Sequence, residues 1–149
     1  MEGTPNRLAT KPSWLITQIA VHARRLVTEA FASSDARGYH YRLLAALREF
    51  GPASQAELGR RSHMDRSDVV AAVNDLATAG FVERSPDPAD RRRNTVTITA
   101  EGVRQLRRLD RAVDKVQDEL LTPLSAADRQ TLIALLGRVL EHHGGAPTE

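Results

Sequence analysis

Three consecutive arginines, Arg91, Arg92 and Arg93, follow Asp90 in the segment DPADRRRNTVTI, residues 87–98. The guanidinium group presents a planar fork of N–H donors that fits phosphate oxygens and guanine edges. A run of charge is more often only a solvated loop, so the run by itself leaves both interpretations open. The choice between them depends on the elements that hold the arginines.

No other set of residues has the spacing of a catalytic or metal site. The chain contains no cysteine, which excludes disulfides and thiolate ligands. His142 and His143 are adjacent, so on a helix they point to different faces, and we predict no metal site there. Gly-rich phosphate loops, nucleophile elbows and paired-histidine helix motifs are also missing from the sequence. We therefore expect neither an enzyme nor a cofactor.

The composition indicates one globular domain with an aliphatic core. Hydrophobic residues make up 41% of the 149 residues, whereas aromatic residues make up only 4%. The net charge is +2, yet only Lys11 and Lys115 of the 21 basic residues are lysines, which leaves 19 arginines. No apolar run approaches the roughly 20 residues of a membrane span, and the first residues do not resemble a signal peptide. We expect a soluble, cytoplasmic protein without a membrane partner.

Periodic apolar residues predict the helices of the first part of the chain. Residues 1–12 show no period and are predicted to be a flexible tail, whereas steps of three and four residues predict a helix within residues 13–35. The same steps predict a second helix over residues 39–50, which Gly51 and Pro52 end.

A helix-turn-helix motif is predicted next. Ser54 and Glu57 have the spacing of a capping box at the start of a short helix. Asp65 is the expected N-cap of the following helix, and residues 62–64 form the tight break between the two.

Two strand candidates enclose the arginine run. Residues 81–84 form the first, and residues 95–99 form the second, in which every residue is β-branched. A helix-turn-helix followed by a hairpin with a basic tip is a winged helix, which we place at residues 36–100. The predicted fold class is mainly α with a small β-hairpin wing.

Long apolar rows also mark residues 101–143, which we predict to form two helices before a flexible tail at residues 144–149. Such helices would expose apolar stripes if they stood alone, and a second copy of the chain can cover them. We therefore predict a homodimer built from residues 13–35 and 101–143 on either side of the winged helix. The expected interface residues are Leu15, Ile19, Leu106, Leu109, Val113, Leu132, Leu136 and Val139.

The order of these elements over residues 13–143 resembles the MarR family of bacterial transcription regulators. The most specific match is DPADRR, residues 87–92, followed by VTITAEG, residues 96–102, which is similar to the family's wing signature except that Ile98 stands where leucine is usual. The segments QAEL and LATAGFVER also resemble the family's helix-turn-helix region. The family binds palindromic DNA as homodimers, commonly as repressors that small ligands release. The resemblance implies the same functions here.

The resemblance also implies roles for the wing residues. In the family's wing the acid holds the arginine for insertion into the minor groove, which here places Asp90 beside Arg92. Arg91 and Arg93 are then expected at phosphates, where contacts position the protein without reading sequence.

The recognition helix is expected to bring its N-terminal end to base edges in the major groove. Arg66 carries donors for guanine, and Asn74 can pair with adenine. Asp68 has two open roles, accepting from cytosine or stabilising the helix dipole. The predicted contacts are Arg66, Ser67, Asp68, Val70 and Asn74 in this helix, and Ser54, Gln55, Arg60, Arg61 and Arg84 at phosphates.

Aromatic and polar residues of the first two helices form a candidate site for a small aromatic or phenolic ligand, because family members hold ligands near this place. Ordinary core or dimer packing is the alternative for these side chains. The candidates are Trp14, His22, Arg25, Tyr39 and Tyr41, with His40 beside them.

We expect a homodimeric repressor that binds double-stranded DNA at a palindrome. The alternative is a winged-helix module for protein–protein interaction, in which the basic wing is merely solvated. Later arginines at helical spacing with Asp110 and Asp114 predict a salt-bridged exposed face rather than a second DNA site. These arginines are Arg104, Arg107, Arg108 and Arg111.

Overall fold

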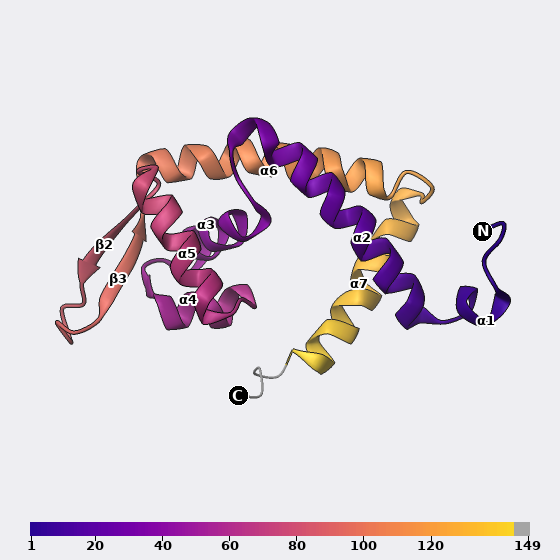
Figure 1. Ribbon diagram of the computed structural model, residues 1–149, viewed down its shortest axis with the longest axis horizontal. Helices are drawn as coiled ribbons and strands as arrows, with labels where there is room; N and C mark the ends of the chain where they lie inside the picture. Colours follow the sequence, from indigo (N-terminus) through magenta and orange to yellow (C-terminus); the bar gives the residue numbers. More distant parts are fainter. Residues whose placement is uncertain (145–149) are drawn as a thin grey trace.

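The structure, a computed structural model, describes residues 1–144. That part of the chain is mainly α-helical and has a three-stranded antiparallel sheet in the order β1-β3-β2 (Figure 1). The elements follow in the order α1 (Asn6–Ala9), α2 (Pro12–Phe31), the 3-10 turn η1 (Ala32–Ser34), α3 (Gly38–Phe50), β1 (Ala53–Ser54), α4 (Gln55–Ser62), α5 (Arg66–Thr78), β2 (Val82–Pro86), β3 (Asn94–Ile98), α6 (Ala100–Leu120) and α7 (Ala126–His143). The predicted fold class, a winged helix-turn-helix with helices before and after it, is confirmed.

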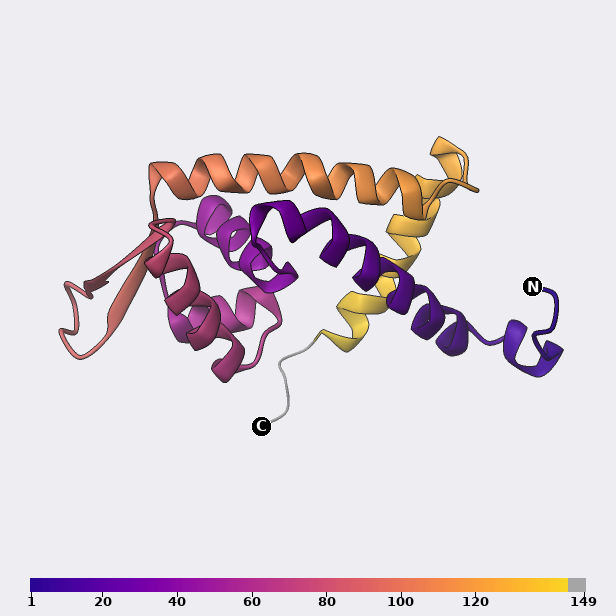
Figure 2. The same ribbon diagram turned by 45° about the horizontal axis from the view of Figure 1, so that its top comes forward.

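Helices α3, α4 and α5 and the sheet form a lobe at one end of the molecule, and α6 leads away from the base of the hairpin (Figures 1 and 2). The side chains inside the lobe are aliphatic. Leu43 and Leu44 of α3, Leu58 of α4, and Val69 and Val73 of α5 are fully buried. These positions recur at the three- and four-residue steps of one helix face, which is why the sequence pattern located the helices well.

Helix α6 packs against α2 and α3 and completes this core. Leu106 is 6% exposed and Leu109 is 0% exposed within the single chain. We predicted both residues in the dimer interface, but within the single chain they belong to the core. The face that carries them already lies against α2 and α3, so it offers no area to a second copy. Val113 is half-buried against the same core.

Helix α7 and the outer side of α2 leave apolar side chains exposed. No residue of α7 is buried. Contiguous apolar surface of this kind is unusual on a soluble monomer. The exposed large apolar residues of these two helices are Ile16, Ile19, Val21, Ile133, Leu135, Leu136, Val139 and Leu140, while Leu15 and Leu132 are half-buried.

Some element boundaries differ from the predicted ones. Helix α1 occupies four residues of the segment 1–12, which was predicted to have no regular structure. Helix α2 ends at Phe31, and Asp35 adopts a left-handed conformation with φ of 47°, so the helix does not continue through residue 35. Strand β1 was not predicted, because its two residues are too few to show alternation. The predicted tail at residues 144–149 lies outside the described residues except for Gly144.

The helix-turn-helix has the predicted capping box. The Ser54 hydroxyl accepts from the Glu57 amide at 3.2 Å, and the Glu57 carboxylate accepts from the Ser54 amide at 2.9 Å. This backbone hydrogen bond lowers the pKa of the Glu57 carboxyl. His63 breaks the chain with a left-handed φ of 51°, and Asp65 is the N-cap of α5, although its side chain makes no capping hydrogen bond.

The base of the wing is packed tightly against the first turn of α6. Thr99 is the N-cap of α6, and its hydroxyl accepts from the Gly102 amide at 3.1 Å and donates to the Gly80 carbonyl at 2.7 Å. A Cβ on Gly102 would collide with the Phe81 carbonyl oxygen and would lie 2.8 Å from the Ile98 side chain. Only glycine allows this approach of helix and hairpin.

Among the helices of residues 1–144, none has both the length and the apolar character needed to cross a lipid bilayer.

Candidate nucleic-acid interface

Residues 87–93 form the tip of the wing, and two aspartates fold it. The Asp87 carboxylate accepts from the Ala89 amide at 2.9 Å, and the Asp90 carboxylate accepts from the Arg92 amide at 3.0 Å. Such bonds from an aspartate to the backbone two residues later build local turns. The role of Asp87 was not predicted, although an aspartate before Pro88 is a turn signal.

The three arginines of the tip are exposed. No salt bridge within residues 1–144 includes Arg91, Arg92 or Arg93. Asp90 contacts Arg92 through its main chain and not through the guanidinium, so the side-chain brace we predicted is not present in the chain alone. Asp90 instead fixes the backbone from which Arg92 extends.

The recognition helix α5 buries one face and exposes the other. Val69, Val73 and Leu76 point inward and are buried. The opposite side is exposed along the helix, and Asp68 is an acidic residue in the first turn, where the helix dipole favours negative charge. The exposed side carries every predicted base contact: Arg66, Ser67, Asp68, Val70 and Asn74.

A side-chain hydrogen bond joins the wing to the recognition helix. The Arg84 guanidinium on β2 donates to the Asn74 amide oxygen on α5. We predicted that Asn74 reads adenine and that Arg84 contacts phosphate, but in the chain alone the two side chains pair with each other. No sequence pattern indicated this pair, because its members lie on different elements and meet only in the folded lobe.

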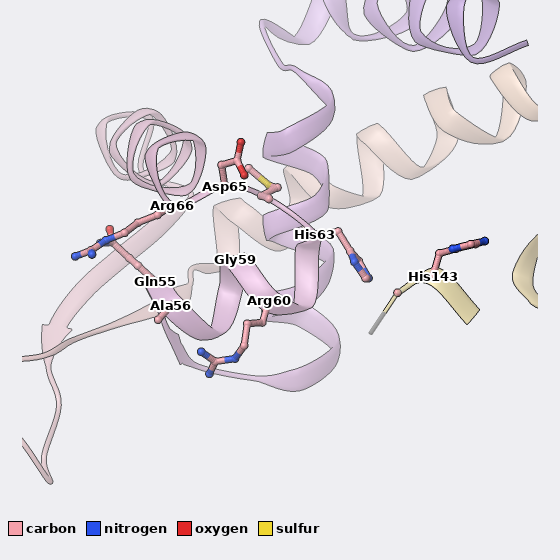
Figure 3. Close-up of a pocket in the computed structure, with 10 residues that line it drawn as sticks. Gln55, Ala56, Gly59, Arg60, His63, Asp65, Arg66 and His143 are labelled. Atoms are coloured by element: carbon pink, nitrogen blue, oxygen red, sulfur yellow. The ribbon is translucent and has the colours of Figure 1, made fainter. Parts of the chain in front are cut away.

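A cleft of about 440 Å³ lies between the helix-turn-helix and the end of α7 (Figure 3). Gln55 and Arg60 of α4 and Arg66 of α5 line it together. The predicted phosphate contacts of α4 therefore share one surface with the start of the recognition helix. The His63 side chain points from the turn toward the end of α7, whereas the His143 side chain points away from it (Figure 3).

Arg61 belongs to a different surface. Its guanidinium lies over the Phe50 ring, 5.2 Å from the centroid. Both residues line a second cleft of about 540 Å³, together with Tyr41 and Ser62. This cation–π contact separates Arg61 from Arg60, so the phosphate role predicted for Arg61 has less support than that of its neighbour.

The structure does not bring the predicted ligand-binding residues into one cavity. Tyr41 lines the cleft beside Phe50, whereas Tyr39 lines a third cleft of about 530 Å³ on another side of α3. Trp14, His22 and Arg25 of α2 are not among the residues that line either cleft. Arg25 pairs with Glu29 at 3.0 Å.

Tyr41 links α3 to α6. Its hydroxyl donates to the Asp110 carboxylate at 2.7 Å. Partial burial and, next, this hydrogen bond raise the pKa of Tyr41 to about 12. The salt-bridged face predicted for α6 is present only in part: Arg104 pairs with Glu101, while Arg108 donates to Gln105.

The helix-turn-helix, the wing of paired strands β2 and β3, and the exposed arginines define a winged-helix protein of the DNA-binding type. Residues 34–93 match the MarR family. A putative transcriptional regulatory protein for the hcr operon of Thauera aromatica is 35% identical over 107 residues, which are 72% of this chain and 64% of that relative. This chain therefore spans less than two thirds of the length of that relative.

Two solved structures have the same fold. The PcaV transcriptional regulator from Streptomyces coelicolor, in complex with its natural ligand, is 29% identical with a TM-score of 0.78, covering 95% of this chain and 98% of that one. A mutant MarR from E. coli, complexed with operator DNA, is 25% identical with a TM-score of 0.78, covering 92% and 99%. Together with the sequence matches, these likenesses show that the chain is similar to the MarR family of bacterial winged helix-turn-helix transcription regulators and has their fold.

Proposed function

We propose that the chain is a homodimeric, sequence-specific DNA-binding repressor. Helix α5 lies in the major groove, and Arg92 enters the flanking minor groove, where the negative potential attracts arginine. The observation that carries the proposal is the exposed arginine tip, held by its own backbone turns, beside the exposed face of α5. Arg91 and Arg93 contact phosphates in this arrangement.

Helix α4 adds to the same surface. Gln55 and Arg60 lie beside Arg66 along one cleft, so donors from two helices face the same partner. DNA phosphates form a continuous anionic surface, and several phosphate contacts fix the register of a recognition helix. Ser54 is used in the capping box, yet its hydroxyl keeps a donor for a phosphate.

The second copy follows from the apolar rows of α2 and α7. A symmetric dimer would cover these rows and place two lobes about a two-fold axis. Half-sites would then lie one helical turn apart, roughly 34–36 Å between centres, and the operator would be a palindrome.

Selection of duplexes from a random DNA pool tests the function directly. We expect enrichment of a palindrome with half-sites about 10–10.5 base pairs apart, bound with an affinity that falls steeply with salt. Failure to enrich any sequence would contradict the proposal. Protein capture without salt-dependent DNA binding would favour the protein-interaction module instead.

We propose that a small aromatic or phenolic ligand weakens DNA binding and binds near Trp14, His22 and Tyr41, although these residues share no described cleft within the single chain. The solved PcaV structure contains its natural ligand, which supports ligand control in this fold. Such a ligand must prefer the lobe spacing that does not fit DNA, because equal affinity for both states shifts nothing. Crystals soaked with compounds that release the protein from DNA test the place, and a ligand found on a distant surface would overturn it.

A further inference from the structure

His40 is a buried histidine in the third position of α3, 7% exposed. Its Nδ1 accepts a hydrogen bond from the Arg37 amide at 3.0 Å. A neutral ring with an acceptor at Nδ1 carries its proton on Nε2. Nε2 lies 3.0 Å from a carboxylate oxygen of Asp75 on α5. His40 therefore caps its own helix and donates to the recognition helix at the same time.

Asp75 is an unexpected residue on a DNA-binding helix. A negative charge near phosphates opposes binding, and the Asp75 side chain is 61% exposed. Within residues 1–144, its only side-chain hydrogen bond is the one to His40. Apart from His40, the buried residues of α3 and α5 are apolar, and apolar contacts are not directional. The hydrogen bond is the directional contact that fixes how α5 is rotated against α3.

The next residue along α3 makes a second link. Tyr41 donates to Asp110 of α6 at 2.7 Å. Adjacent residues of α3 thus hold the recognition helix on one side and the long helix α6 on the other. The orientation of α5 relative to α6 depends on α3 through these two bonds.

We propose that His40, through its Nε2–H bond to Asp75, positions the recognition helix for DNA, and that the neutral ring is the binding-competent state. The inference rests on the proposed DNA-binding function. His40 is a positioning residue, because it is buried behind α5 and does not face DNA.

Protonation of His40 removes one of its two hydrogen bonds, the one that Nδ1 accepts. A proton on Nδ1 converts the acceptor for the Arg37 amide into a donor, so the cap of α3 is lost. The ring lies beside a solvent-open cleft of about 530 Å³, which gives protons access. The charged and titratable groups around it are Asp75 of α5, Tyr39 of α3, Asp35 and Arg37 before α3, and Arg108 of α6 acting through Gln105.

The first test compares Asp75→Ala with Asp75→Asn on the duplex that the wild-type protein selects from a random pool. Both changes remove the same charge, which by simple electrostatics tightens binding equally. Asn keeps an oxygen that accepts from Nε2–H, and Ala does not. We expect Asp75→Ala to bind about threefold to tenfold more weakly than Asp75→Asn. Equal affinities of the two variants would overturn the inference.

The second test uses His40→Asn, whose side-chain oxygen replaces Nδ1 as the cap but cannot reach Asp75. We expect His40→Asn to bind DNA more weakly than the wild type. Adding His40→Asn to Asp75→Ala should cause no further loss of affinity, because each change removes the same hydrogen bond. Additive losses would contradict the pairing.

The pH profile separates positioning from a merely structural role. Wild-type affinity should fall, relative to His40→Asn, as the pH is lowered from about 8 to about 5. Parallel profiles would overturn the role of the neutral ring. Melting curves show whether His40→Asn folds. If it does not, the comparison of Asp75→Ala with Asp75→Asn still tests the inference, because Asp75 is exposed. A wild-type protein that selects no duplex would instead contradict the proposed function.

Discussion

Arg92 depends on its backbone for its direction. Asp90 and Asp87 fold the wing tip through amide hydrogen bonds, and the arginine side chains of the tip have no salt bridge within residues 1–144. The backbone of the tip is therefore fixed, whereas the guanidinium groups can adjust their positions. This division suits a minor-groove contact, whose depth and width vary with sequence.

Arg92→Ala should cost about 1–3 kcal/mol of DNA binding and relax the preference for A·T-rich flanks. Arg91→Ala and Arg93→Ala should weaken all sequences alike and lower the salt slope by about one for each phosphate that the variant no longer neutralises. Fluorescence anisotropy at several salt concentrations measures both effects. Equal behaviour of the three variants would mean that no arginine of the tip is specific.

Asp90→Ala separates electrostatics from geometry. Removal of an acid near DNA should tighten binding, whereas loss of the bond to the Arg92 amide should loosen the tip. We expect affinity for the selected duplex to fall in a titration at moderate salt. A rise in Asp90→Ala, with no change in Arg92→Ala, would show that the arginine run is only a solvated loop.

Tyr41→Phe should lower the free energy of unfolding by about 1 kcal/mol at pH 8, because the hydrogen bond to Asp110 is lost. The pKa of Tyr41 is raised from 10.0 to about 12, so the folded state holds this proton more tightly than the unfolded state does. The stabilisation is complete below about pH 10 and is lost as the pH rises through about 12. Urea unfolding of both proteins between pH 8 and the alkaline range should show the difference shrinking, and a constant difference would contradict this.

At the scale of elements, the junction of the wing and α6 is closely packed and held by hydrogen bonds. Thr99 joins the hairpin base to the helix start, and Gly102 lets the two approach. The direction of the wing is therefore set by the long helix. A change in α6 should be transmitted to the wing.

Gly102→Ala should destabilise the protein by about 1–3 kcal/mol, because the added methyl group displaces the Phe81 carbonyl. Gly137→Ala is the matched control, since a Cβ there meets no atom within 4 Å. That change should stabilise α7 by up to about 1 kcal/mol through helix propensity. Thermal unfolding compares the two, and similar melting temperatures would show that the junction yields easily.

Sequence patterns predicted the helices and strands themselves better than they predicted which of these elements pack against one another. The capping box of Ser54 and Glu57 was predicted correctly because its hydrogen bonds join residues three positions apart. The period of α6 showed that Leu109 faces inward, but not whether α2 or a second chain covers it. The His40–Asp75 bond joins residues 35 positions apart, and no local rule predicts such a contact.

The whole molecule has two unequal parts. The lobe and the inner face of α6 are packed within one chain, while α2 and α7 carry exposed apolar rows. Figures 1 and 2 show both helices extending beyond the lobe. A second copy of the chain would cover the apolar rows of α2 and α7 without changing the packing of the lobe.

Sedimentation at micromolar concentration should give a dimer with more than roughly 2,000 Å² of total buried surface, the class of obligate interfaces. Leu136→Glu and Val139→Glu should yield folded monomers, because both side chains are exposed in the single chain. Leu109→Ala should instead cost about 2–5 kcal/mol of stability, since it removes core volume. A wild-type monomer would contradict the dimer.

The near-absence of lysine has a practical and a biological consequence. Residues 36–100 contain many arginines and not one lysine, so acetylation of lysine cannot reduce the charge of the wing or of the helix-turn-helix. Amine-reactive labels would likewise attach at Lys11, Lys115 and the amino terminus and leave the arginines unmodified. Any covalent control of the basic surface would have to act on arginine itself or on the hydroxyl groups beside it.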